Sequence, residues 1–229
     1  MTHTRKHIAV LIFALSQEEE IRRKPFLRNT LLQQNLTSRI HNIVKKTGLD
    51  YYIYSEQEQI GTSFGERFTN AIKDIYDKGY DAIITLGNDT PNLNTTHLSK
   101  AIDTLQQGQS VIGPSFDGGF YLMGLQKEMF DHKKFRGFSW NTSEVRQEIY
   151  TYLESYKKSI FQLSFLYDLD HFSDIISIYK TLPFLLKKLR SVLQRILQKE
   201  KKTVATLQTL QFYVSLKTYY NKGSPSHTY

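Results

Sequence analysis

Four aspartates follow apolar runs that are typical of strands, and carboxylates in such positions can bind metals and phosphates. Asp89, Asp117 and the pair Asp168 and Asp170 each stand just after a run of this kind. Open α/β sheets bind their ligands at the carboxyl ends of the strands, so we expect these carboxylates to converge. Oxygen ligands from separate strands could hold Mg²⁺ or Mn²⁺ on the phosphates of a nucleotide. Such a metal would offset charge on a leaving phosphate or diphosphate.

The run Ala82 to Leu86 is the clearest of these strands. It is rich in β-branched residues and ends at Gly87, near Pro91, which cannot donate a hydrogen bond to a sheet. A single aspartate after a strand is more often a turn former or a helix cap. Asp117-Gly118 is also a common hairpin turn signal. The metal interpretation therefore depends on the coincidence of three strand ends.

The elements that would position these residues alternate along the chain. Strands are predicted at 8–15, 51–54, 82–86, 111–112, 120–125 and 161–166, and helices at 31–46, 64–78, 96–107, 141–157 and 173–180. Asn141 is the expected cap of the fourth helix, with Glu144 three residues later. This alternation predicts an α/β fold with a mostly parallel sheet flanked by helices on both faces. We assign this domain to residues 1–180.

A basic helical extension is predicted at 181–222, followed by a disordered tail at 223–229. Within it, 184–199 is an amphipathic helix with leucines on one face and Lys and Arg on the other. Its basic face could make peripheral contact with an anionic membrane surface. Alternatively, the apolar face packs on the domain or on a second subunit, which would make an oligomer, and the charges are solvated.

Composition narrows the class of protein. The net charge of +8 belongs to the carboxyl-terminal segment, because residues 1–179 hold 20 Lys and Arg against 21 Asp and Glu. This distribution argues against a nucleic-acid partner for the main domain. The chain has no cysteine, which excludes disulfides and thiolate metal sites. The apolar run at 8–15 is too short to cross a bilayer and lacks a secretory cleavage pattern, so we expect a cytoplasmic protein.

Several segments together resemble one known family. The two main ones are Gly87 to Leu93 and Gly113 to Leu125, which look like the paired signature of the DUF2064 family. Three further segments resemble other motifs of that family, namely Phe64 to Phe68, Phe138 to Thr142, and Asp168 to His171 with Asp174. The resemblance covers roughly residues 8–180. The family is grouped with the GT-A-type glycosyltransferases and is similar to certain nucleotidyltransferases.

The resemblance implies a GT-A-like, Rossmann-like fold that binds a nucleotide or a nucleotide sugar as substrate. It implies metal binding by Asp89 and Asp170, and catalytic roles for Asp89 and Asp117. It further implies contacts with the nucleotide-linked substrate, made by Glu66, Arg67, Asn88, Gly118 and Gly119. For Arg67, a surface charge on the first turn of a helix is an equal alternative.

One segment departs from the family pattern. Family members usually carry a Gly-containing basic loop directly after the first strand, and its N–H groups and cations would surround phosphate. Here the segment from Ser16 to Pro25 has three consecutive glutamates and no glycine. Its Arg22, Arg23 and Lys24 could still supply cations from a helical turn. Either the donor chemistry has changed, or the cavity has been kept and turnover lost.

The function predicted from these features is transfer from a nucleotide-activated donor, most simply a glycosyl transfer assisted by a divalent metal. The alternatives are a nucleotidyltransferase acting on a small phosphorylated acceptor, or a non-catalytic nucleotide or metabolite binder. The chain has no Walker loop, no Gly-x-Gly-x-x-Gly and no Gly-x-Ser-x-Gly motif.

Overall fold

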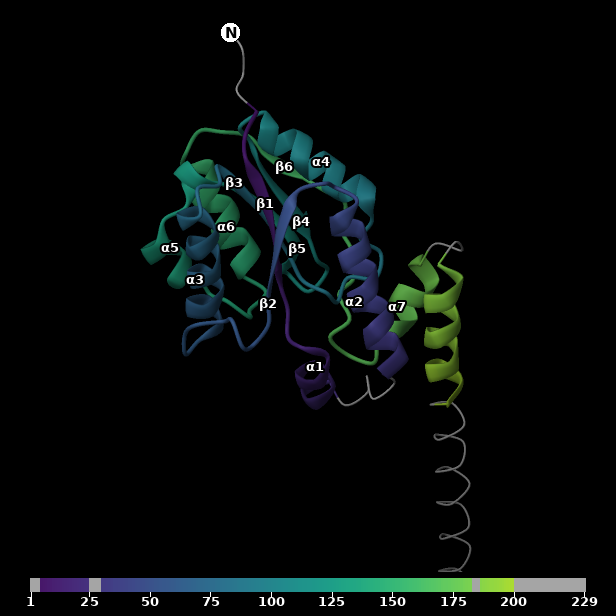
Figure 1. Ribbon diagram of the computed structural model, residues 1–229. Coiled ribbons are helices and arrows are strands. Elements are labelled where there is room, and N and C mark those ends of the chain that lie inside the picture. Colours follow the sequence, from purple (N-terminus) through teal and green to yellow (C-terminus); the bar gives the residue numbers. More distant parts are fainter. Residues whose placement is uncertain (1–4, 25–29, 183–185, 200–229) are drawn as a thin grey trace, which may run out of the picture. The chain divides into compact units, whose positions relative to one another are not determined.

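A six-stranded sheet forms the centre of the domain (Figure 1). The computed structural model describes residues 5–24, 30–182 and 186–199. The strands follow the order β2 (Asp50–Tyr54), β1 (Ile8–Phe13), β3 (Ala82–Leu86), β5 (Phe120–Gln126), β4 (Ser110–Pro114) and β6 (Ile160–Gln162). The predicted α/β class with a GT-A-like, mostly parallel sheet is confirmed.

One strand runs against the others. β1 pairs in parallel with β2 and β3, and β4 pairs in parallel with β6. β5 lies antiparallel between β3 and β4. Since β4 and β5 are consecutive in the chain, they form a hairpin, and its turn contains Asp117. The Asp-Gly pair therefore makes the hairpin turn that its residue types indicate.

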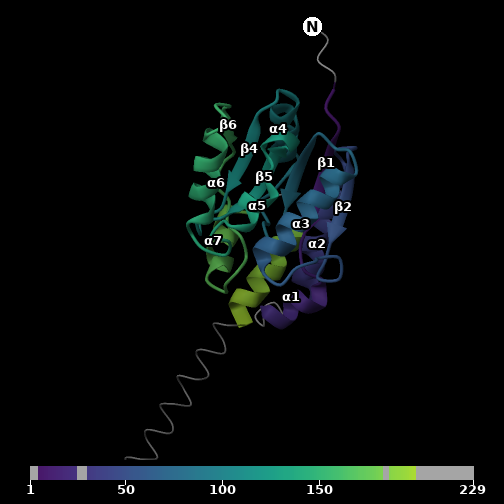
Figure 2. The ribbon, with the colours of Figure 1, turned by 90° about the vertical axis from the view of Figure 1, so that its left-hand side faces the viewer.

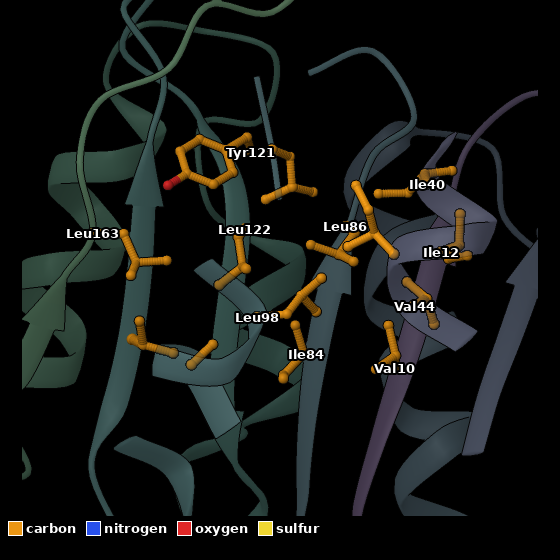
Figure 3. Close-up of a cluster of buried hydrophobic side chains, with 14 of the residues drawn as sticks. Val10, Ile12, Ile40, Val44, Ile84, Leu86, Leu98, Tyr121, Leu122 and Leu163 are labelled. Carbon is orange, nitrogen blue, oxygen red and sulfur yellow. The ribbon is translucent and has the colours of Figure 1, made fainter. Parts of the chain in front are cut away.

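Helices cover both faces of the sheet (Figure 2). α2 (Thr30–Lys45) and α4 (Thr95–Gln106) pack against one face, where Val10, Ile84 and Leu98 belong to one buried cluster (Figure 3). α3 (Phe64–Asp77), α5 (His132–Arg136) and α6 (Val145–Glu154) cover the other face. Alternate residues of each central strand serve the two cores, which is why these strands are apolar throughout.

The remaining elements lie near the carboxyl ends of the strands. α1 (Gln17–Arg23) directly follows β1, and α7 (Asp174–Thr181) follows the segment of Asp168 and Asp170. A 3₁₀ turn, η2 (Lys127–Met129), and α5 were not predicted. α6 begins at Val145 rather than near Asn141, because Asn141 has a φ of 61° and cannot continue into a helix.

The chain beyond Pro183 forms a separate unit, Phe184–Tyr229. Its described residues are helical over 187–199, as the sequence predicts. Contact of this helix with a membrane or a second subunit stays a prediction, and the expected disordered tail at 223–229 lies outside the described residues. Within the described part of the chain, no helix has the length and apolar character needed to span a membrane.

Candidate active site

Four carboxylates line one cavity of about 440 Å³. Asp89 comes shortly after β3, Asp117 lies in the β4–β5 turn, and Asp168 and Asp170 follow β6. The structure thus brings together the three strand ends on which the predicted site depends. The volume is within the range of cavities that bind small molecules.

Aromatic side chains make up much of the rest of the wall. They are Phe13, Phe64, Phe68, Phe120, Tyr121 and Trp140. No Lys or Arg of the described residues lines the cavity. Rings of this kind offer faces for stacking a nucleobase or a sugar. The cavity lining therefore combines aromatic and acidic side chains.

Asp117 is held by its own turn. Its Oδ1 accepts hydrogen bonds from Ser115 Oγ at 2.5 Å and from the Gly119 N–H at 2.9 Å. Gly118 has a φ of +98°, and a Cβ there would lie 2.5 Å from the Ser143 backbone oxygen. Arg146 of α6 donates to the Ser115 carbonyl oxygen at 2.8 Å, which fixes the turn to that helix. Asp117 itself is exposed.

The loop that carries Asp89 is held from two sides. Arg39 of α2 donates to the carbonyl oxygens of Pro91 at 3.1 Å and Leu93 at 2.7 Å. On the other side, the Leu169 N–H donates to the Asp89 carbonyl oxygen at 2.9 Å. This last bond joins the loop after β3 to the segment after β6. The positions of Asp89 and Asp170 are therefore coupled through the backbone.

Asp168 and Asp89 lie in surroundings that disfavour negative charge. Burial raises the pKa of Asp168 well above its ordinary value, and the charge of Asp89 raises it further. The Thr90 hydroxyl donates to Asp168 Oδ1 at 2.5 Å, which opposes this rise only in part. Burial also raises the pKa of Asp89, against the effect of Lys24. Negative charge on these two carboxylates is therefore unfavourable unless a cation lies nearby.

Lys24 supplies positive charge at this place. Its Nζ lies 2.8 Å from Asp170 Oδ1, 3.3 Å from Asp89 Oδ2 and 3.7 Å from Glu20 Oε2. It also donates to the Leu169 carbonyl oxygen at 3.0 Å. Burial alone would lower the pKa of Lys24, but the three carboxylates together raise it above its ordinary value. The side chain is 16% exposed and stays protonated.

The other cations of this segment serve a different purpose. Ser16 caps the start of α1, because its Oγ accepts a hydrogen bond from the Glu19 N–H. The N–H and the hydroxyl of Ser16 in turn donate to the Glu56 carboxylate. Arg22 and Arg23 both pair with Glu19, at 2.7 Å and 2.6 Å. The predicted helical turn is present, and these two arginines are engaged within it.

Three predicted substrate-binding residues lie away from the cavity lining. Glu66 accepts hydrogen bonds from Thr62 and pairs with Arg136 at 2.5 Å, so it ties α3 to α5. Arg67 follows it on α3, and Asn88 is buried beside α2. A role for Glu66, Arg67 or Asn88 in nucleotide binding stays a prediction. Of the two predicted glycines, Gly119 lines the cavity.

The segment before α6 also contributes to the cavity lining, through Trp140, Asn141, Thr142, Ser143 and Val145. Trp140 donates from Nε1 to the Phe135 carbonyl oxygen at 2.6 Å and packs edge-on against Phe68, with ring centroids 5.1 Å apart. Asn141, in the left-handed backbone region, also lines the cavity. Residues held in that region are often found at functional sites.

The predicted metal ligands do not fit a divalent cation in this arrangement. Within the described residues, no group of three or more Asp, Glu, His or Cys side chains could hold a metal ion. The oxygens of Asp89 and Asp170 instead surround the Lys24 ammonium. A divalent ion and an ammonium group cannot share one position, because their charges repel.

Sequence reasoning missed two features of the site. It did not assign Lys24 to the carboxylates, although the Glu20 and Lys24 spacing of four residues was a visible signal. It also treated Ser139 to Glu144 as a helix start, whereas residues of this segment line the cavity. The single tryptophan within that segment was the signal available.

The sheet order and the antiparallel β5 are those of a GT-A-like fold. A solved structure from Desulfovibrio desulfuricans G20, described as a "putative nucleotide-diphospho-sugar transferase", is similar over 88% of this chain and 98% of that chain. The TM-score is 0.69 and the sequence identity is 22%. At this identity the comparison establishes the fold.

Residues 41–142 match the sequence model of DUF2064, whose description is "Uncharacterized protein conserved in bacteria". The resemblance predicted from the motifs is thereby confirmed over these residues. The matched region includes the loop of Asp89 and the turn of Asp117, while Lys24 and Asp170 lie outside it.

Other solved structures match the chain with lower TM-scores. One is 4-diphosphocytidyl-2C-methyl-D-erythritol synthase from Anaerococcus prevotii DSM 20548, with 13% identity, a TM-score of 0.47, and coverage of 82% of this chain and 96% of that chain. Another is Rv0371c from Mycobacterium tuberculosis H37Rv in complex with manganese, with 11% identity, a TM-score of 0.45, and coverage of 77% and 100%. No protein of curated function matches the chain.

Proposed function

We propose that the protein is a transferase that binds a nucleotide-activated donor, and that it transfers a glycosyl group to a small acceptor. The observation that carries this proposal is the cavity that Asp89, Asp117 and Asp170 from three strand ends line together with aromatic side chains. The aromatic side chains suit the flat base or the sugar of a donor.

Asp117 is the residue that we assign to the acceptor. It is exposed, lines the cavity, and is held in place through a single carboxylate oxygen by Ser115 and Gly119. As a general base it would take the proton of an acceptor hydroxyl. The acceptor oxygen then bonds to the reactive carbon of the donor. The bond from that carbon to the diphosphate oxygen breaks, and the nucleoside diphosphate leaves.

A second candidate function is binding without turnover. It is favoured by the absence of Lys and Arg from the cavity lining among the described residues. An acidic cavity without a basic loop could bind a nucleotide-linked metabolite weakly and not turn it over. A nucleotidyltransferase remains the alternative within the enzymes. The three functions differ in which ligand binds and which product is released.

Trp140 offers a direct test, because it is the only tryptophan and lines the cavity. Its fluorescence should change saturably with one or more nucleotide sugars, and incubation with acceptor mixtures should release a nucleoside diphosphate. Pyrophosphate release with triphosphates would instead indicate nucleotidyl transfer. Binding without any release would indicate the non-catalytic binder. No fluorescence change with any nucleotide would contradict the proposal.

Variants make the test specific. Asp117→Asn should keep donor binding and lose at least a hundredfold in turnover, as expected on removal of a general base. Asp103→Asn is the matched control, since Asp103 is exposed on α4 and does not line the cavity. It should leave both binding and turnover unchanged. Equal turnover of the two variants would remove Asp117 from the mechanism.

A further inference from the structure

The arrangement around Lys24 has the form of a cation site. Four oxygens lie around one nitrogen: those of Asp170, Asp89 and Glu20, and the carbonyl oxygen of Leu169. An ammonium group has three N–H donors, and three of these oxygens lie within 3.3 Å of it. Each of its three N–H donors therefore has an acceptor oxygen within reach.

The position is built into the fold. Lys24 stands at the carboxyl end of α1, where its N–H donates to the Glu20 carbonyl oxygen at 2.8 Å. The helix follows β1 directly, and Ser16 anchors its start. Glu20 is 6% exposed and its Oε2 accepts no hydrogen bond among the described residues. Its charge therefore faces Lys24 across 3.7 Å.

The same carboxylates are those that a divalent ion would need. Mg²⁺ and Mn²⁺ take oxygen ligands at about 2 Å, usually from one or two carboxylates together with water and phosphate. Lys24 Nζ lies between Asp89 and Asp170, at ammonium distances from both. A metal ion could bind these two oxygens only after the Lys24 side chain had left.

We propose that the Lys24 ammonium holds the cation position between Asp89 and Asp170, so that the donor site works without a divalent metal ion at these carboxylates. The amino group is part of the chain, and its positive charge faces these carboxylates. It offsets part of the negative charge of these carboxylates. This inference rests on the proposed function and names the cation that lies at the carboxylates of the same site.

The test is a titration of the protein with Mn²⁺ alone. Binding is measured from the electron paramagnetic resonance signal of the free ion. Wild-type protein should not bind Mn²⁺ through Asp89 and Asp170. Lys24→Met, which removes the charge and keeps most of the volume, should bind Mn²⁺ at least tenfold more tightly than wild type. The double variant Lys24→Met/Asp170→Asn should lose that gain. Lys73→Met, on the exposed side of α3, is the matched control and should behave as wild type.

Two results would overturn the inference. One is Mn²⁺ binding by the wild-type protein that Asp170→Asn abolishes. The other is the absence of Mn²⁺ binding by both the wild type and a folded Lys24 variant. Lys24→Gln is the second variant, because its amide can still donate to Asp170 and Leu169 if loss of the charge prevents Lys24→Met from folding. None of these titrations contains a nucleotide, so their outcome is separate from that of the donor-binding test.

Discussion

Trp140 lies against Gly65 of α3 so closely that a Cβ on Gly65 would come within 2.4 Å of Trp140 Cδ1. The two residues belong to separate motifs of the sequence, and their contact joins these motifs in the fold. Gly65 leaves room for the indole, and Glu66 beside it pairs with Arg136. The Phe64 to Phe68 motif therefore helps to build the wall of the cavity.

Gly65→Ala should displace Trp140 and open the aromatic wall. We expect a shift of tryptophan emission to longer wavelength, since the ring gains water contact, and a loss of stability of about 1–3 kcal/mol from overpacking. Fluorescence spectra and urea unfolding measure both. Thr69→Ser, which removes volume at a buried position of the same helix, is a control for general loosening of α3. An unchanged spectrum for Gly65→Ala would contradict the assigned contact.

Gly118→Ala should cost more than the usual penalty for a left-handed residue. The backbone term is about 1–2 kcal/mol, and the collision with Ser143 adds to it. Gly48→Ala separates the two effects, because Gly48 has a φ of +70° and a Cβ at that position would meet nothing within 4 Å. Urea unfolding of both variants gives the difference. Equal losses would mean that the turn of Asp117 moves freely away from Ser143.

Arg39→Met should loosen the loop that carries Asp89. It leaves the carbonyl oxygens of Pro91 and Leu93 without their charged donor, which costs roughly 1.5–3 kcal/mol. We expect lower stability in urea, together with weaker donor binding if the proposed function holds. Ser38→Ala, at an exposed neighbouring position on α2, should change neither quantity. A stable Arg39→Met would show that the loop is held by other contacts.

Glu20→Gln should stabilise the protein at neutral pH. Burial raises the pKa of Glu20 above its ordinary value of 4.5, and this outweighs the opposing effect of Lys24. The folded state then binds more protons than the unfolded state between these two pKa values, so wild-type stability falls as pH rises through that window. Each unit of difference between the folded and unfolded pKa of Glu20 corresponds to about 1.4 kcal/mol in the free energy of unfolding.

The advantage of Glu20→Gln should therefore be small near pH 4.5 and grow toward pH 7. Thermal melts across this range measure it. Glu18→Gln is the matched control, because Glu18 is exposed on the same helix. A constant difference at all pH values would contradict the assigned environment of Glu20.

The strands and long helices were predictable because their apolar periodicity is strong. β3 has the predicted bounds, and α3 begins at the predicted Phe64. The direction of β5 was less accessible, since an apolar run does not show which way it crosses a sheet. The convergence of Asp89, Asp117 and Asp170 followed from the positions of strand ends alone.

The role of Lys24 could not be predicted in the same way. Arg22, Arg23 and Lys24 are adjacent cations, and only the rotation of α1 decides which of them faces the carboxylates. That rotation is set by the burial of Glu20, a charged residue for which the sequence indicates exposure. The loop of Asn141 was also missed. The capping residues predicted a helix from Asn141, but the positive φ of Asn141 prevents a helix from starting there.

The short edge strand β6 has a consequence for how long the site stays intact. β6 has three residues and pairs with β4 on one side, while β3 pairs with a strand on each side. Edge segments with few pairings open without global unfolding. Amide hydrogens from 160 to 170 should thus exchange with solvent much sooner than those of β3. Each such local opening would carry Asp170 away from Lys24 and break the Leu169 to Asp89 backbone bond, while the turn of Asp117 between β4 and β5 stays paired.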